Sequence, residues 1–391
     1  MKIMLANLSK MVGDAGGLAK VTSMFADEMV RRGHYVGVIH SDEDEDDFFY
    51  KTDCQVKLYN VKNIDGVTLK YPASYKIKRE FSRLFSKKKA REVNEDFEYK
   101  FLLNNFGKII EIFSPDVVVS FQLSTTKMLL FDLKVNFPVI TMIHGHPGDI
   151  FMDYPDMDVK ALAESNVCQV LLPSFKDIIT EKVPQANVVV IGNVVPQNVE
   201  LVDLEKDKNI YKIIQVGRLG KNVKRQHLLI KAFAKVADKY PNWHVEFWGT
   251  EGKSSYTNLL KTLIKKYGLK DKVFFKGTTS NIFSVLREAD IFAFPSAFEG
   301  FGLALAEAMS VGLPVIGYRS CSAVNELILD GNNGFLCDDG ITDFANKLDI
   351  LMSSKKLRLE FGRNGRSLIK QYEPSLIWDK WEILLKDVSG K

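Results

Sequence analysis

The sequence predicts an α/β fold of two Rossmann-like, doubly wound domains that face each other across a cleft. Short runs of apolar and β-branched residues alternate with stretches of helical periodicity, and this pattern of parallel sheets wrapped by helices occurs twice. The 391 residues also exceed the size of one comfortable hydrophobic core. Between the two series, residues 193–208 are polar, acid-rich and contain Pro196, as expected of a linker.

Each series supplies the strands of one domain. In the N-terminal domain, 1–195, strands are expected at residues 3–6, 36–39, 117–120, 139–143, 170–172 and 188–191. In the C-terminal domain, 196–371, strands are expected at residues 213–216, 245–248, 273–275, 291–294 and 314–317. Residues 372–391 predict a final helix with an apolar face made of Leu376, Ile377, Trp381, Leu384 and Leu385. The pattern leaves the packing partner of this helix open.

The composition argues against several classes of protein. A net charge of +4 is too small to favour nucleic acid as a partner. No apolar run reaches the ~20 residues that span a bilayer, and the chain opens directly into a strand rather than a signal peptide. We therefore expect a cytoplasmic protein. The four cysteines lack the spacing of a disulfide framework or a zinc site.

Residues 289–318 carry the strongest functional signal, because they predict a strand, a loop, a helix and another strand in direct succession. The helix should begin near Phe301 and end at Gly312, since glycine commonly ends helices. The N–H groups at a helix N-terminus attract anions, and Gly300 and Gly302 would let a diphosphate approach the backbone closely. We therefore expect phosphate to bind at this position.

Two glutamates accompany this phosphate site. Glu299 flanks it, and Glu307 lies on the helix that forms it. Carboxylates that are tolerated beside a diphosphate can accept hydrogen bonds from the hydroxyl groups of a sugar or a ribose. A nucleotide-sugar contains both parts. The alternative is an ordinary helix of a Rossmann-like domain with two surface glutamates.

The segment from Gly277 to Gly334 resembles the GT-B glycosyltransferases of family 4 (group 1), which are retaining enzymes marked by two glutamates separated by seven residues. The similarity rests on Phe-Glu-Gly-Phe-Gly, Glu-Ala-Met and Gly-Leu-Pro-Val-Ile. It implies that Glu299 holds hydroxyl groups of the donor sugar and that Glu307 holds the nucleotide ribose. The N–H groups of Gly302 and Leu303 would hold the phosphates. The donor site implied in this segment comprises Gly277, Glu299, Gly300, Phe301, Gly302, Leu303 and Glu307.

Two basic residues follow the first strand of the second series. Arg218 comes directly after residues 213–216, and Lys224 lies six residues later. Together they can neutralise a leaving diphosphate, which otherwise requires an acid or a metal. Family members commonly have a spacing of five, so Lys221 and Arg225 compete with Lys224 for this role. A solvated basic loop is the alternative interpretation.

The N-terminal domain contributes two further candidates, each at the end of a predicted strand. Gly16 and Gly17 match neither the dinucleotide nor the P-loop motif, and the resemblance implies a loop that closes over the donor from the opposite domain. A plain strand-to-helix turn is the alternative. His144 occupies the position where the family has a histidine facing the transferred sugar, with His146 as second choice. Either histidine can instead be structural.

No metal or other cofactor is expected. Asp44-Glu45-Asp46 and Asp156-Met157-Asp158 match the DxD pattern of metal-dependent glycosyltransferases, but neither follows a strand of the nucleotide-binding half. The first lies in the acidic run 42–47, which we interpret as a solvated loop.

A basic segment, 76–91, contains eight Lys or Arg residues and one acidic residue, Glu80. Apolar residues recur among these charges at helical spacing, namely Ile77, Phe81, Leu84 and Phe85. Such a basic amphipathic helix is typical of a contact with an anionic membrane surface. The alternative is a solvated basic face on a helix packed against the N-terminal domain. RNA binding lacks any supporting motif.

These observations predict a metal-independent hexosyltransferase. By resemblance, it would transfer a hexose with retention from a nucleoside diphosphate sugar, UDP-linked, to a saccharide or lipid-linked saccharide. Synthesis of a bacterial-type surface polysaccharide, capsule or lipopolysaccharide would be its setting. The alternatives are a nucleotide-sugar epimerase or hydrolase of the same fold, and a non-catalytic sugar-binding or scaffold subunit. The residues that would bind the acceptor are not identified by any pattern.

Overall fold

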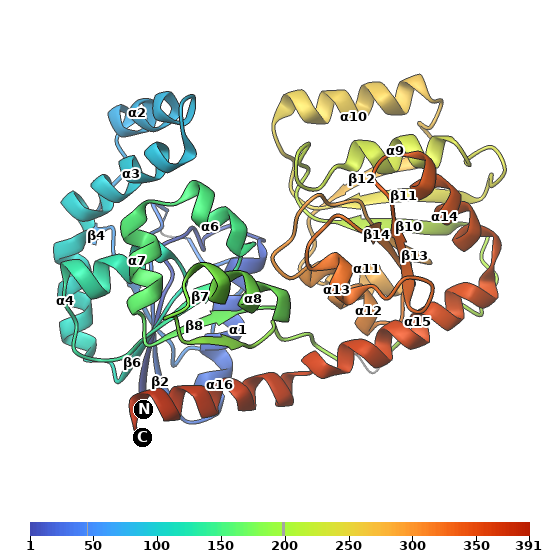
Figure 1. The fold of residues 1–391 in the computed structure, drawn as a ribbon. Coiled ribbons are helices and arrows are strands. Elements are labelled where there is room, and N and C mark those ends of the chain that lie inside the picture. The colour runs from blue at the N-terminus through green and yellow to red at the C-terminus, as the bar shows by residue number, and fades with distance from the viewer. Residues whose placement is uncertain (45, 198–199) are drawn as a thin grey trace. The chain divides into compact units, whose positions relative to one another are not determined.

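The computed structural model describes residues 1–44, 46–197 and 200–391. The described chain forms two compact units (Figure 1). The first comprises Met1–Gly192 together with Ile377–Lys391, and the second comprises Asn193–Leu376. The division after Gly192 lies within a few residues of the expected linker position at Pro196.

The first unit is built on a seven-stranded parallel sheet with the order β3-β2-β1-β6-β7-β8-β9. Its strands are β1 (Lys2–Ala6), β2 (Tyr35–His40), β3 (Lys57–Asn60), β6 (Val117–Ser120), β7 (Val139–Ile143), β8 (Val167–Val170) and β9 (Val188–Val190). A separate antiparallel hairpin consists of β4 (Asn63–Ile64) and β5 (Val67–Thr68). The central strands β1, β6 and β7 are almost wholly buried, because helices cover both faces of a parallel sheet.

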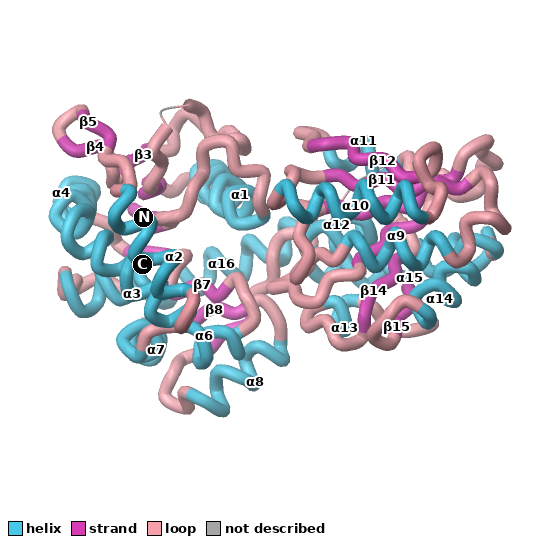
Figure 2. Tube along the Cα trace, turned by 90° about the horizontal axis from the view of Figure 1, so that it is seen from above, coloured by secondary structure: helices cyan, strands magenta, loops and turns pink. Residues whose placement is uncertain are grey.

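The helices of the first unit connect these strands. They are α1 (Gly17–Arg31), α2 (Ala73–Arg83), α3 (Lys87–Phe97), α4 (Leu103–Phe113), α5 (Leu123–Lys127), α6 (Pro147–Asp153), α7 (Asp156–Glu164) and α8 (Pro173–Lys182). Two short π-helical turns, η1 (Glu98–Leu102) and η2 (Met128–Asp132), follow α3 and α5. The basic segment therefore forms two helices, α2 and α3, joined by residues 84–86, and α2 lies against α3 (Figure 2).

The second unit repeats the design with a six-stranded parallel sheet of order β12-β11-β10-β13-β14-β15. Its strands are β10 (Tyr211–Val216), β11 (Trp243–Trp248), β12 (Val273–Gly277), β13 (Ile291–Phe294), β14 (Val315–Tyr318) and β15 (Gly334–Cys337). Its helices are α9 (Gln226–Ala234), α10 (Ser254–Lys266), α11 (Ile282–Arg287), α12 (Leu303–Ser310), α13 (Val324–Leu327), α14 (Thr342–Ser353), α15 (Lys355–Ile369) and the 3₁₀ turn η3 (Lys370–Tyr372). Two parallel-sheet domains of this kind confirm the predicted fold class.

A few strands differ from expectation. The predicted strand 170–172 is β8, which ends at Val170 because Pro173 begins α8 and turns the chain. Two strands, β3 and β15, were not predicted. β3 lies at a sheet edge with exposed or half-exposed residues and has no continuous apolar run. β15 begins at Gly334, and its apolar run of three residues is short.

The last helix, α16 (Pro374–Ser389), runs into the first unit and packs on α1. The Phe25 ring contacts Trp378 and Trp381 with centroid separations of 5.4 and 4.8 Å. Beside this aromatic contact, the Arg32 guanidinium bonds Glu382 at 2.5 Å. The packing partner that the sequence left open is therefore the N-terminal domain.

Replacing Trp381, which is 3% exposed, should destabilise the first unit. Trp381→Ala removes a buried indole from the contact with Phe25, and we expect a loss of about 3–5 kcal/mol in the free energy of unfolding. Denaturant unfolding followed by circular dichroism measures this loss. Ile383→Ala, on the same helix at 59% exposure, is the matched control and should cost little. Equal losses in the two variants would contradict the packing described above.

Candidate functional site

Most of the predicted donor residues of the second unit lie where the strand order of its sheet reverses, between β10 and β13. Ligands of open α/β sheets bind beyond the carboxyl ends of the strands at such a point. Arg218 and Lys224 lie in the loop after β10, and Glu299 and Gly302 lie in the loop after β13. The topology thus brings together residues that are up to 84 positions apart in the sequence, from Arg218 to Gly302.

Backbone and side-chain hydrogen bonds join these two loops. The Ala297 N–H donates to the Val223 carbonyl oxygen at 2.8 Å. Arg225, with a left-handed φ of 48°, donates from its guanidinium to the carbonyl oxygens of Pro295 and Ser296, both at 2.8 Å. The sequence indicates Arg225 only as a competitor of Lys224 for the phosphate role. In the structure its guanidinium instead ties the loops together.

Lys224 and Glu299 form an ion pair at the centre of this arrangement. The Lys224 ammonium donates to Glu299 Oε1 at 2.5 Å, and the two side chains are 21% and 11% exposed. The ammonium also lies 4.9 Å from the centre of the Phe294 ring, at the end of β13. Partial burial beside an aromatic ring strengthens the attraction between the two charges relative to water. The sequence assigned these residues separate roles and did not predict their contact.

Helix α12 begins with Leu303, two residues after the expected start at Phe301. Gly302 precedes it with a φ of 78°, a left-handed conformation that glycine adopts at little cost. The first N–H groups of the helix have no partners within the helix itself. The Phe301 side chain is buried and packs edge-on against Tyr372 at 5.0 Å, so any contact of Phe301 with a donor would fall to its backbone.

Glu307 lies in the middle of α12 and is 4% exposed. Together with the nearly buried Glu299 side chain, this excludes the alternative of two surface glutamates. A buried carboxylate requires hydrogen-bond donors around it.

Arg218 and Gly277 occupy the same carboxyl edge of the sheet. The Arg218 side chain is exposed immediately beyond β10. Hydrogen bonds connect the ends of the neighbouring strands β10, β11 and β12. The Gly217 N–H donates to the Trp248 carbonyl oxygen at 2.8 Å, and the Gly249 N–H donates to the Gly277 carbonyl oxygen at 2.7 Å. A Cβ at Gly249 would lie 2.4 Å from Gly217 O, so this close approach requires glycine. Gly277 ends β12, the outermost strand, and Gly300 lies half-buried before α12.

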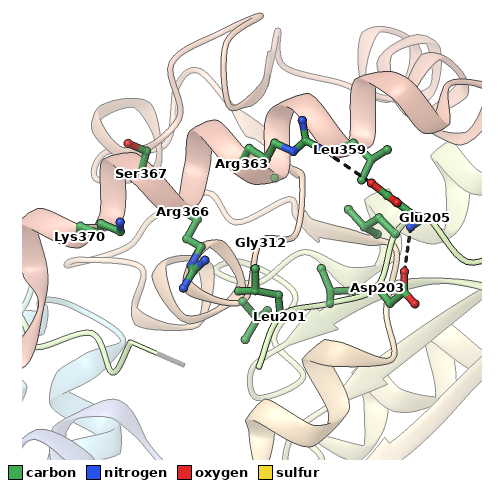
Figure 3. Close-up of a pocket in the computed structure, with 13 residues that line it drawn as sticks. Leu201, Asp203, Glu205, Gly312, Leu359, Arg363, Arg366, Ser367 and Lys370 are labelled. Atoms are coloured by element: carbon green, nitrogen blue, oxygen red, sulfur yellow. Dashed lines mark hydrogen bonds and ion pairs between the residues drawn. The ribbon is translucent and has the colours of Figure 1, made fainter. Parts of the chain in front are cut away.

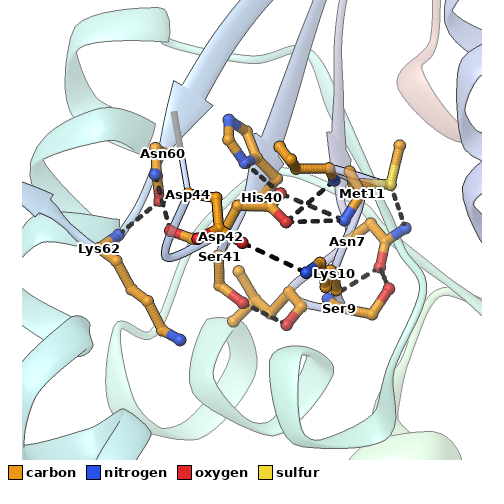
Figure 4. Close-up of polar contacts among 12 residues, drawn as sticks. Asn7, Ser9, Lys10, Met11, His40, Ser41, Asp42, Asp44, Asn60 and Lys62 are labelled. Carbon is orange, nitrogen blue, oxygen red and sulfur yellow. Dashed lines mark hydrogen bonds and ion pairs between the residues drawn. The ribbon is translucent and has the colours of Figure 1, made fainter. Parts of the chain in front are cut away.

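In the first unit the strand order reverses between β1 and β6, and the predicted glycines follow β1. Gly16 is the N-cap of α1, and Gly17 is its first residue. Figure 4 shows the buried Asp42 at the base of this loop, where it accepts hydrogen bonds from the N–H groups of Met11 and Val12, each at 3.0 Å. His40 Nδ1 lies 2.8 Å from the same carboxylate.

The prediction that residues 42–47 form a solvated loop is therefore wrong for Asp42, which is buried. Burial opposes its ionisation, but the contacts from His40 and from the two backbone N–H groups outweigh burial and lower its pKa. Asp42 lies two residues after β2, and this position directly after a buried strand was the signal in the sequence that could have indicated a buried role. Among its DxD neighbours, Glu45 lies outside the described residues, and Asp44 pairs at the surface with Lys10.

The second DxD pattern is divided between surface and interior. Asp156 is exposed and bonds Lys88 at 2.6 Å, whereas Asp158 is 1% exposed. In residues 1–44, 46–197 and 200–391, no group of three or more His, Cys, Asp or Glu side chains is arranged to hold a metal ion.

His144 follows β7, where its half-buried ring stacks on Phe121 at 5.2 Å. Its Nε2 atom is buried and has no hydrogen-bond partner in the part of the chain that the structure describes. Burial lowers the pKa of His144 to about 4, so the ring is neutral at physiological pH. His146 differs, because its Nδ1 accepts the Gly148 N–H at 3.1 Å and caps α6.

His144 lines a cavity of about 370 Å³ inside the first unit, which was not predicted. Its walls also include Arg91 and Glu95 from α3, Glu98 from η1 and Asp158 from α7. Burial raises the pKa of Glu98 to about 7. Burial and the nearby charge of Glu95 raise the pKa of Asp158. Two carboxyl groups that line the cavity, those of Glu98 and Asp158, therefore have raised pKa values and ionise less readily than usual.

A second cavity, of about 490 Å³, lies in the second unit between residues 201–205 and α15, where Arg363 approaches Glu205 at 3.7 Å (Figure 3). It includes Gly312, which precedes β14 and so marks the amino edge of the sheet. It is therefore separate from the donor residues at the carboxyl edge.

Comparison with known proteins finds similarity to glycosyltransferases. Residues 196–368 match the family model of the glycosyl transferases group 1. An uncharacterized glycosyltransferase of Haemophilus influenzae is 24% identical over 96% of this chain and 97% of its own length. The amylovoran biosynthesis glycosyltransferase AmsD of Erwinia amylovora is 28% identical over 57% of this chain and 62% of its own.

Among solved structures, S. aureus TarM bound to fondaparinux, α-GlcNAc-glycerol and UDP has a TM-score of 0.77 at 17% identity. The alignment covers 98% of this chain and 99% of TarM. This likeness shows the GT-B fold, and the family match supports a glycosyltransferase.

The neutral state of His144 can be tested by NMR. Because burial lowers its pKa to about 4, its ring signals should keep the chemical shifts of neutral imidazole from pH 8 down to pH 5. Histidine-labelled protein supplies the signals, and the loss of one set in His144→Gln assigns them. A midpoint between pH 6 and 7 would show that the ring is solvated and would contradict the buried geometry.

Proposed function

We propose that this protein is a retaining, metal-independent glycosyltransferase that moves a hexose from a UDP-sugar to a saccharide acceptor. The observation that carries the proposal is the Lys224–Glu299 ion pair beside the N-terminus of α12, at the point where the strand order reverses. Cation, carboxylate and oriented backbone N–H groups there match the phosphate and hydroxyl groups of a nucleotide-sugar.

The proposed chemistry relies on charge stabilisation and positioning. The bond between the sugar C1 and the diphosphate breaks, and the acceptor oxygen forms the new bond to C1 on the same face. The acceptor's proton passes to an oxygen of the departing diphosphate. Arg218, Lys224 and the first N–H groups of α12 stabilise the negative charge that develops on that diphosphate. Glu299 orients the sugar through its hydroxyl groups, and Glu307 contacts the ribose.

The first unit would supply the acceptor side. The cavity beside His144 is polar, and its carboxyl groups with raised pKa can both donate and accept hydrogen bonds. Such a wall suits the hydroxyl groups of an uncharged saccharide better than an anionic acceptor. The neutral His144 ring, with a free Nε2 position, can bond a sugar hydroxyl without adding charge. Gly16 and Gly17 would approach the donor from this unit.

The comparisons support a role in the synthesis of a surface polysaccharide. The TarM complex contains UDP, and the AmsD relative acts in amylovoran biosynthesis. We accordingly propose that the product belongs to a surface polysaccharide, capsule or lipopolysaccharide.

A donor screen tests the proposal directly. Purified protein is mixed with UDP-, GDP- and ADP-sugars, and nucleotide release is followed with and without an extract of bacterial lipids and oligosaccharides. We expect UDP release that depends on the extract, because the reaction needs an acceptor oxygen. Release without the extract would instead indicate a hydrolase, and loss of donor without nucleotide release would indicate an epimerase. If every donor stays intact with and without the extract, the result would indicate a non-catalytic subunit.

Arg218→Ala should lower kcat by roughly 100-fold or more, because one donor to the departing diphosphate is lost. Arg218 is exposed, so the variant should unfold at the same temperature as the wild type. Lys221→Ala is the matched control, since Lys221 is an exposed cation in the same loop and should retain activity. If both variants lose activity equally, the effect comes from the net charge of the loop and not from Arg218.

A further inference from the structure

The outer surface of α2 is unusual, because large apolar side chains point into solvent. Ile77, Phe81, Leu84 and Phe85 are 70%, 63%, 80% and 71% exposed. Their spacing places them on one face of α2 and of the turn that follows it. The rings of Phe81 and Phe85 contact each other at 5.2 Å. We call these four residues the α2 ridge.

The opposite face of α2 holds the helix on the first unit. Tyr75 donates a hydrogen bond to Asp96 at 3.0 Å, and its ring contacts Phe97 on α3 at 5.6 Å. The Arg79 guanidinium lies 5.4 Å from the centre of the Tyr71 ring. No residue of α2 is fully buried. The ridge therefore does not pack on the first unit, although α2 itself packs on α3 through its other face.

Positive charge surrounds the ridge. Lys76 and Lys78 flank it on either side at exposed positions, and the following turn leads to Lys89, also exposed. The one acidic residue, Glu80, is bonded by Arg79 and by Arg83 at 2.9 and 2.8 Å, so its charge is offset locally. Lys87 and Lys88 bond Asp153 and Asp156, at 2.7 and 2.6 Å.

We propose that the α2 ridge docks on the surface of an anionic lipid bilayer. Apolar side chains enter the boundary between headgroups and acyl chains, while lysines beside them contact the anionic headgroups. The complementary charge favours this occupant over a neutral protein surface. No helix in the described residues is long and apolar enough to cross a membrane, so contact through α2 would be peripheral.

Docking through α2 would also affect how an acceptor reaches the cavity of the first unit. Helix α3 follows α2 after the three residues 84–86, and its Arg91 and Glu95 line the cavity of the first unit. A docked α2 would hold this wall of the cavity close to the bilayer. An acceptor carried on a lipid would then reach the cavity without leaving the membrane. This last step depends on the proposed function, whereas the docking itself does not.

The experiment measures flotation of the full chain with large unilamellar vesicles in a density gradient. One vesicle population is phosphatidylcholine alone, and the other contains about a third phosphatidylglycerol. We expect binding to the anionic vesicles that is weaker by about tenfold or more in 0.5 M than in 0.05 M salt, because salt screens the lysines. Phe81→Ser/Phe85→Ser should reduce the partition coefficient by about tenfold or more.

The matched control is Val67→Ser/Ile112→Ser, which replaces two apolar residues of the same unit that are 70% and 76% exposed, away from the ridge. It should bind anionic vesicles as the wild type does. Unchanged denaturant unfolding of the first unit, followed by circular dichroism, shows that each variant is folded, and UDP binding by calorimetry tests the donor site of the second unit separately. The proposal is overturned if the wild type stays unbound, if it binds neutral vesicles equally well, or if the ridge variant and the control lose binding alike.

Discussion

The hydrogen bonds between the loop after β10 and the loop after β13 are the constraint on which the donor-side residues depend. The two strands are neighbours only because the sheet order reverses there, so Lys224 and Glu299 meet at a single position of the fold. Arg225 secures that position through two carbonyl oxygens of the β13 loop. Such preorganisation matters for an electrostatic site, because groups that are already oriented need not rearrange when charge develops.

The Lys224–Glu299 pair also reduces the repulsion expected between Glu299 and a bound diphosphate. A carboxylate beside a helix N-terminus that binds phosphate would repel the diphosphate, and the cost would rise with burial. In the structure the ammonium offsets the Glu299 charge at 2.5 Å. An ammonium has three N–H donors, so Lys224 can bond a phosphate oxygen while it still bonds Glu299. Under the proposed function, this contact would let the carboxylate and the diphosphate occupy the same site.

The sequence predicted the strands correctly where their residues are completely buried. It predicted the arrangement of the candidate site only in part. Strands β6, β7 and β13 have the expected bounds, because wholly buried strands are continuous apolar runs. Arg225 and Asp42 escaped prediction for a different reason. Each acts on backbone groups of a loop distant in sequence, and no local pattern encodes such a partner. The cavity beside His144 is lined from several separate elements and was invisible for the same reason.

The α2 ridge illustrates a related limit of periodicity. The spacing of Ile77, Phe81 and Leu84 correctly indicated one apolar helix face, but spacing contains no information about the direction in which that face points. Ordinarily the apolar face packs inward, because that burial stabilises the fold. Here the contacts of Tyr75 hold the other face on α3 instead. The first unit thus forgoes the stability that this apolar area would contribute, which is the pattern expected when a surface must remain available to bind.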